Sequence, residues 1–194
     1  MTSGVAAVIL AGGEGKRIGG GKPLKMLKGR RLIDLALGQA RSWSDAVAIA
    51  VREDSQVGAP GAALIHDEPG IEGPLGGLIA GLTFARDQGR ELLLTIPSDM
   101  PFLPPDLLDR LAAALGRHAS ALASSGGHVH PVCGLWRVSA LERTADYVAG
   151  GRRSLRGFAE TIGCVAVEWP GEAEDPFFNI NSIDDLAEAE RRIG

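Results

Sequence analysis

A glycine-rich segment carrying Arg17 and Lys22 follows the first apolar run of the chain. Residues 10–24 read LAGGEGKRIGGGKPL. Glycines let backbone N–H groups approach a phosphate chain closely. Arginine can neutralise phosphate charge with two parallel hydrogen bonds, and lysine does so as a compact point charge. The spacing matches neither GxxxxGK[ST] nor GxGxxG, so the segment predicts a different phosphate-binding loop rather than a simple surface turn.

A carboxylate follows the clearest buried strand of the sequence. Residues 91–97 read ELLLTIP, and Asp99 comes two residues later in SDMPFLP. Proteins usually hold Mg²⁺ with one or two carboxylates together with substrate phosphates. We therefore expect Asp99 to bind a magnesium ion, with a cap of the turn before Pro101 as the alternative.

Two further motifs carry polar groups suited to a nucleotide or its acceptor. Asp67 precedes the small-residue run GPLGGL at 73–78, and its carboxylate can accept from a ribose hydroxyl or from guanine N1–H and N2–H₂. Asn179 and Asn181 point to the same side of an extended chain, where two carboxamides can contact phosphate, ribose or a hydrated metal. The alternatives are a surface Asp at a helix entry and an Asn pair that satisfies a turn.

A basic pair and a histidine pair complete the set of candidates. Arg152, Arg153 and Ser154 lie among glycines and could hold the acceptor's phosphate, unless they form a solvated loop. His128 and His130 form an HxH motif, but the sequence offers no matching His/Cys cluster for zinc. Cys133, in an apolar run, is expected to be a buried small hydrophobe.

Strand-like and helix-like patterns alternate along the chain and must position these residues. Strands are expected at 5–10, 46–51, 62–66, 91–97, 120–124, 128–138 and 165–169, and helices at 31–43, 74–87, 105–115, 139–148, 154–162 and from Ser182 onward. This alternation predicts a single doubly wound α/β domain, with a mostly parallel sheet and helices on both faces. Such sheets bind ligands at the carboxyl ends of their strands, where the first motifs fall.

Composition restricts the class of partner. The chain has 194 residues, of which 45% are apolar, and a net charge of −4. No large basic field favours nucleic acid, and no apolar stretch approaches the ~18 residues that cross a membrane. The two cysteines lie far apart without a disulfide framework, as is typical of a reducing cytosol. We expect a cytoplasmic protein with one domain over 1–194, in which residues 1–118 bind the nucleotide and 119–194 the acceptor.

The motifs resemble, in their order, those of molybdenum cofactor guanylyltransferases. The shared segments are LAGG with Arg17 and Lys22, then GPLGGL, SDMPFLP, HPVCGLW and FFNINSIDDL, and they extend from residue 10 to residue 186. LAGG with the arginine and lysine is shared by a wide group of nucleotidyltransferases, whereas LAGG in place of LAAG, HPVxGLW and the FxNINxxxDL ending are similar to the guanylyl branch.

The resemblance implies a fold of the nucleotide-diphospho-sugar-transferase type and a role for each matching residue. Backbone groups of Leu10, Ala11, Gly12 and Gly13 would hold the nucleotide. Lys22 would contact its phosphates, Asp67 the nucleoside, and Asp99 both Mg²⁺ and nucleotide. Asn179 and Asn181 would line the active site near the acceptor. The resemblance also implies transient contact with molybdenum-insertion proteins and apo-molybdoenzymes.

Two positions depart from the family's usual pattern. The family often has Asn-Arg after its second strand, where this chain has Val51-Arg52, and often an Asp before the lysine, where this chain has Gly21. The first departure removes an expected side-chain amide from the nucleotide site and puts guanine selectivity in question more than transferase chemistry.

The expected reaction is transfer of GMP from Mg·GTP to the terminal phosphate of molybdopterin, with release of pyrophosphate. An acceptor phosphate is already ionised, so the reaction needs positioning and charge neutralisation by Asp99, Lys22 and Arg17 rather than a strong base. The alternatives are a cytidylyl- or guanylyltransferase for another phosphorylated acceptor and a nucleotide-binding regulator without turnover. A Rossmann dehydrogenase is disfavoured because GxGxxG is absent and no acidic residue ends the second strand.

Overall fold

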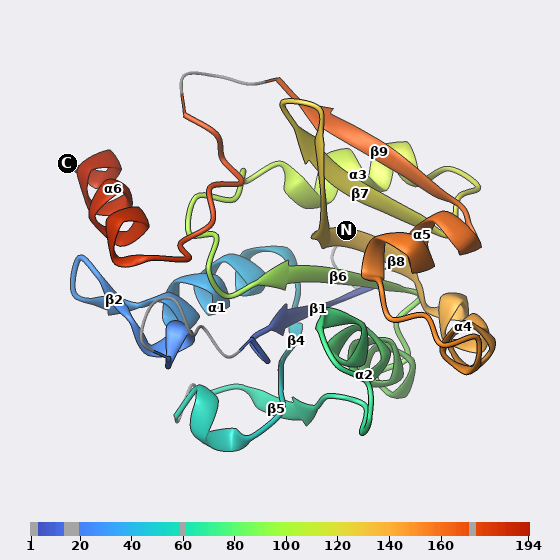
Figure 1. Ribbon diagram of the computed structural model, residues 1–194. Helices are drawn as coiled ribbons and strands as arrows, with labels where there is room; N and C mark the ends of the chain where they lie inside the picture. Colours follow the sequence, from blue (N-terminus) through green and yellow to red (C-terminus); the bar gives the residue numbers. More distant parts are fainter. Residues whose placement is uncertain (1–3, 14–19, 59–60, 171–173) are drawn as a thin grey trace.

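A single seven-stranded sheet forms the centre of the computed structural model (Figure 1), which describes residues 4–13, 20–58, 61–170 and 174–194. Its strand order is β5-β4-β1-β6-β8-β7-β9. The strands are β1 (Val5–Leu10), β4 (Ala46–Val51), β5 (Ala63–His66), β6 (Leu92–Pro97), β7 (Ser120–Ser125), β8 (His128–Arg137) and β9 (Cys164–Trp169). The predicted mostly parallel α/β sheet is confirmed: β8 alone among these strands runs antiparallel to its neighbours.

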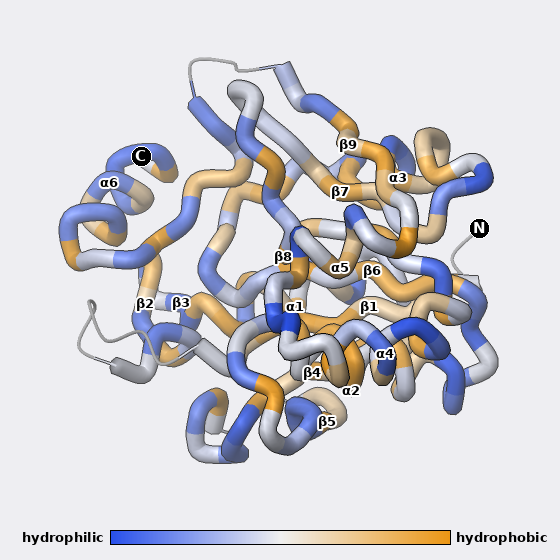
Figure 2. The backbone as a smooth tube through the Cα atoms, turned by 45° about the vertical axis from the view of Figure 1, so that its right-hand side comes forward, coloured by the Kyte–Doolittle hydropathy of each residue, from blue (hydrophilic) through white to orange (hydrophobic). Residues whose placement is uncertain are grey.

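Helices cover both faces of the sheet because alternate strand residues point to opposite sides. Ala7 and Ile9 of β1 pack in one apolar cluster with α1 (Leu32–Trp43) and α3 (Leu107–Leu115). Ala6 and Val8 pack in a second cluster with α2 (Pro74–Asp87), α4 (Thr144–Ala149) and α5 (Leu155–Ile162). Figure 2 shows the apolar strands enclosed between these layers. In the described residues no helix is long and apolar enough to cross a membrane.

The last helix, α6 (Ile183–Ile193), lies outside both layers and packs on a small hairpin (Figure 1). The hairpin pairs β2 (Met26–Leu27) with β3 (Arg30–Arg31). A third apolar cluster joins these parts: Leu27, Leu32, Ile180 and Ala189 are buried in it. The helix begins at the predicted place, since Ser182 and Asp185 form the capping box.

The helix expected at 139–148 begins differently. Residues Val138–Arg143 form a 3₁₀ helix, η4, and the α-helical winding of α4 begins only at Thr144. A 3₁₀ helix repeats every three residues, so Val138 and Leu141 share a face and both pack against the cluster beneath α2.

Candidate active site

A cavity of about 480 Å³ opens at the carboxyl edge of the sheet, beyond the ends of β1, β4, β5 and β6. This volume lies within the usual range for small-ligand sites. Nine of the predicted site residues line it: Leu10, Ala11, Gly12, Gly13, Lys22, Asp67, Asp99, Asn179 and Asn181. Segments far apart in the sequence thus meet at one place, as expected for an edge where parallel strands end.

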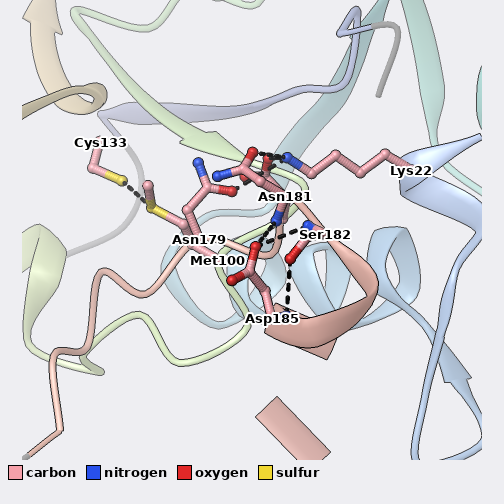
Figure 3. Close-up of polar contacts among 8 residues, drawn as sticks. Lys22, Met100, Cys133, Asn179, Asn181, Ser182 and Asp185 are labelled. Carbon is pink, nitrogen blue, oxygen red and sulfur yellow. Dashed lines mark hydrogen bonds and ion pairs between the residues drawn. The ribbon is translucent and has the colours of Figure 1, made fainter. Parts of the chain in front are cut away.

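Lys22 is the point where three of these segments meet. Its ammonium pairs with the Asp99 carboxylate and donates to Asn181 Oδ1 at 2.7 Å and Asn179 Oδ1 at 3.3 Å; Figure 3 shows the lysine reaching the two amides. The lysine begins a short 3₁₀ helix, Lys22–Leu24, that follows Gly21. Gly21 has a left-handed φ of 58°, which glycine adopts without strain, so the departure from the family's Asp fits the local backbone.

The Asp99 loop is held from two sides. Asp99 follows β6, and its carbonyl accepts a hydrogen bond from the Ile180 N–H at 3.0 Å, which ties the loop to the asparagine segment. The neighbouring Met100 Sδ accepts from Cys133 Sγ at 3.6 Å (Figure 3). Cys133 is buried as expected, and burial raises the pKa of its thiol well above the ordinary value. Asp99 Oδ1 is buried and has no hydrogen-bond partner in the described chain.

An aromatic stack anchors the segment that carries the two asparagines. Phe177 lies flat on the His130 ring, with centroids 4.7 Å apart, and meets Trp169 edge-on at 5.3 Å. His130 Nε2 is hydrogen-bonded to Ser125 Oγ at 2.8 Å. Burial lowers the pKa of His130, against the opposing charge of Asp175. The HxH motif thus supplies a packing residue to this segment.

Asp67 forms the opposite wall of the cavity. It follows β5, and its N–H donates to the Val51 carbonyl at 2.9 Å. A Cβ added to Gly12 would lie 2.5 Å from Asp67 Oδ2, so only glycine allows this close approach. Burial raises the pKa of the Asp67 carboxyl, and the positive charge of Arg52 opposes the shift. Asp67 Oδ1 is buried and lacks a hydrogen-bond partner among the described residues, as suits a group that binds a ligand.

The structure places Arg52, and not Val51, in the cavity wall. Val51 is fully buried in the core cluster with Ile9 and Ala11 and does not line the cavity, whereas Arg52 does. Sequence reasoning did not include Arg52 among the site residues. Its position just beyond a parallel strand, like that of Asp99, is the signal that could have found it.

The predicted acceptor-binding group at 152–154 lies away from this cavity, on the α4–α5 connection. Arg152 stacks over the Tyr147 ring at 4.3 Å, and Arg153 donates to the Val148 carbonyl at 2.9 Å. Ser154 caps α5 by accepting from the Gly157 N–H. These contacts give the three residues a structural role, and their acceptor role stays a prediction. Arg17, the other predicted cation, lies outside the described residues.

The comparisons with known proteins agree with this geometry. Residues 7–163 match the family described as the MobA-like NTP transferase domain. A molybdenum cofactor guanylyltransferase of Bradyrhizobium sp. is 37% identical over 98% of this chain and 93% of its own. One from Cereibacter sphaeroides is 40% identical over 94% of each chain.

Solved structures lead to the same fold. A molybdopterin-guanine dinucleotide biosynthesis protein A from Archaeoglobus fulgidus superposes with a TM-score of 0.77, at 25% identity, over 97% of this chain and 98% of its own. A 4-diphosphocytidyl-2C-methyl-D-erythritol synthase from Anaerococcus prevotii also gives 0.77, at 16% identity over 97% and 95%, and shares the fold. This chain is therefore a nucleotidyltransferase that belongs to the MobA-like NTP transferase family.

Proposed function

We propose that this chain transfers GMP from GTP to the terminal phosphate of the molybdopterin cofactor, giving molybdopterin guanine dinucleotide and pyrophosphate. The observation that carries the proposal is the meeting of Lys22, Asp99, Asn179 and Asn181 at the glycine-lined end of the cavity. Relatives named as guanylyltransferases match nearly the whole chain, and this supports the choice of donor and acceptor.

The nucleotide is proposed to lie between the two sides of the cavity. Gly12 and Gly13 leave backbone groups accessible beside β1, where glycine permits close approach to phosphates. Asp67, whose buried Oδ1 has no hydrogen-bond partner among the described residues, accepts from the nucleoside. Lys22 lies at the other side, within reach of the phosphates, and Asn179 and Asn181 face the acceptor.

Mg²⁺ is the proposed metal, and the donor set fits it. Asp99 contributes a carboxylate whose Oδ1 is buried without a partner in the described chain, and Asn179 and Asn181 turn amide oxygens to the same point. Hard oxygen donors are the ligands that Mg²⁺ prefers. Asp99 would hold the ion, which when bound supplies positive charge beside the nucleotide phosphates.

The proposed reaction is an in-line displacement at the α-phosphorus of GTP. A bond forms from the acceptor's phosphate oxygen to that phosphorus, and the bond to the bridging oxygen of pyrophosphate breaks. Because the attacking phosphate is already ionised, the chain needs no strong base. Lys22 neutralises developing charge, and the cavity walls hold the two substrates in line.

Pyrophosphate release tests this function. GTP, CTP, ATP and UTP are supplied with Mg²⁺, with and without molybdopterin extracted from a molybdoenzyme. We expect release with GTP only when molybdopterin is present. Asp99→Ala and Lys22→Ala should each lower the rate by roughly 10²–10³, the usual loss for one preorganised charge, while circular dichroism shows an intact fold. Release with CTP alone, or near-normal activity of either variant, would contradict the proposal.

The cellular setting is proposed on the same basis. We propose a cytoplasmic enzyme that transiently contacts molybdenum-insertion proteins and apo-molybdoenzymes, which would act on the cofactor beside it. We also propose that residues 1–118 bind the nucleotide and residues 119–194 the acceptor, within one domain. The cavity lining fits this division only in part, since Lys22, from the first part, bonds Asn179 and Asn181 of the second.

A further inference from the structure

The ammonium of Lys22 occupies a cradle of three oxygen donors. The donors are the Asp99 carboxylate, Asn181 Oδ1 at 2.7 Å and Asn179 Oδ1 at 3.3 Å (Figure 3). The lysine and aspartate side chains are only 12% and 14% exposed. A compact ammonium surrounded by hard oxygens is in the position that a metal cation would take.

Two cations cannot share this cradle without strong repulsion, because partly buried charges are poorly screened. Among the described residues, Asp99 is the one acidic residue that lines this end of the cavity, and none of them forms a cluster of three His, Cys, Asp or Glu that could bind a metal more tightly than one carboxylate does. A site with one carboxylate holds Mg²⁺ well only when substrate phosphates add further ligands. Without nucleotide, the lysine therefore has the advantage.

We propose that Lys22 is a built-in cation that keeps the Asp99 site closed to free metal until a nucleotide arrives. When nucleotide phosphates enter, the Lys22 ammonium leaves Asp99 and pairs with the phosphates. The Asp99 carboxylate is then available to the metal that accompanies them. Metal and nucleotide thus enter together, and the empty enzyme does not retain divalent cations. The inference rests on the proposed function for the identity of the ligand, but its central claim concerns the nucleotide-free protein.

Direct binding of Mn²⁺ in the absence of nucleotide tests the inference, with free Mn²⁺ measured by electron paramagnetic resonance. Lys22→Met removes the competing charge and should bind Mn²⁺ at least about tenfold more tightly than the wild type. Lys25→Met is the matched control. It removes an equal charge only three residues along the chain, and the Lys25 side chain does not line the cavity. It should change the affinity by less than about twofold.

Asp99→Asn in the Lys22→Met background should abolish the tightened binding. Mn²⁺ should also raise the melting temperature of Lys22→Met more than that of the wild type, because binding to the native state stabilises it. Lys22→Gln replaces Lys22→Met if the latter does not fold. Equal or weaker Mn²⁺ binding by the folded lysine variant, or binding that survives Asp99→Asn, would overturn the inference.

Neither measurement requires turnover, so the two proposals can fail separately. Tightened Mn²⁺ binding without pyrophosphate release in any assay would leave the lysine exchange standing and reject the proposed reaction. Normal guanylyl transfer by the wild type, with an Mn²⁺ affinity that Lys22→Met leaves unchanged, would support the proposed reaction and reject the lysine exchange.

Discussion

At the scale of single residues, Asp67 shows how a buried carboxyl that is proposed to bind a ligand can lower stability. Burial raises its pKa above the ordinary value of 3.8, so the native protein retains this proton to higher pH than the unfolded chain does. Between the unfolded and the native pKa the unfolded chain binds fewer protons, and stability falls as pH rises. The carboxylate therefore destabilises the ligand-free protein most at neutral pH.

Asp67→Asn should consequently raise the melting temperature at pH 7. The gain should shrink as the pH falls from the raised native pKa toward 3.8 and be lost below 3.8, where the carboxyl is protonated in both states. Thermal unfolding across this pH range measures the effect, with the exposed neighbour variant Glu68→Gln as a control that should show little change. Asp67→Asn should also bind GTP more weakly than the wild type does. A gain that is equal at pH 4 and pH 7, or a loss of stability at pH 7, would contradict this account.

The residues that line the cavity at strand ends could be predicted because each directly follows an apolar run in the sequence. Asp67, Asp99 and the glycines beside β1 follow apolar runs that sequence patterns identify, and all of them line the cavity. Arg152 and Arg153 share the same features of charge and nearby glycine, yet their loop lies on the α4–α5 connection. Charge and glycine content indicate an anion site only when the topology is known.

At the scale of elements, the start of α6 fixes the geometry of the asparagine segment. Asp185 accepts from the N–H groups of both Asn181 and Ser182 at 2.8 Å (Figure 3). Burial acts against ionisation of this carboxyl, but these hydrogen bonds hold its pKa below the ordinary value. The helix cap thus orients the backbone of a residue whose side chain holds Lys22.

Asp185→Ala should therefore cost about 1 kcal/mol of stability, as for other lost caps, and should also lower turnover several-fold through Asn181. Asp184→Ala removes the neighbouring acid from the same helical turn and should affect both quantities less. Chemical denaturation and pyrophosphate release measure the two effects. If both variants behaved alike, the cap would have no part in positioning Asn181.

The small hairpin under α6 shows where element prediction failed. Its two-residue loop, Lys28-Gly29, has positive φ at both positions, as a type I′ turn requires. Asn-Gly or Asp-Gly would have indicated this turn, whereas lysine rarely adopts positive φ. Each strand also has only two residues, which is too short for an alternating pattern to show. The long strands and helices were predicted because their apolar patterns extend over several turns or pleats.

At the scale of the whole molecule, the antiparallel strand β8 explains how two distant parts of the chain build one site. β8 runs against β6, with Thr95 opposite Gly134, so its first residues lie at the carboxyl edge of the parallel strands. Val132 lines the cavity there, and His130 supports Phe177 and the asparagine segment. No local sequence pattern reveals strand direction, so the sequence predicted the edge of the sheet but not this strand's part in it.

Hydrogen exchange can locate both ligands on this architecture. Binding lowers local opening in the segments that contact a ligand, so Mg·GTP should slow amide exchange at 10–13, 67–77 and 97–100. Addition of molybdopterin should extend protection to 177–181, where the asparagines face the cavity. The loop at 150–154 should exchange at the same rate throughout, because its arginines are already engaged with Tyr147 and Val148. Protection of that loop by molybdopterin would instead place the acceptor's phosphate on Arg152 and Arg153, and would mean that the acceptor extends across the α2 face of the sheet rather than along its carboxyl edge.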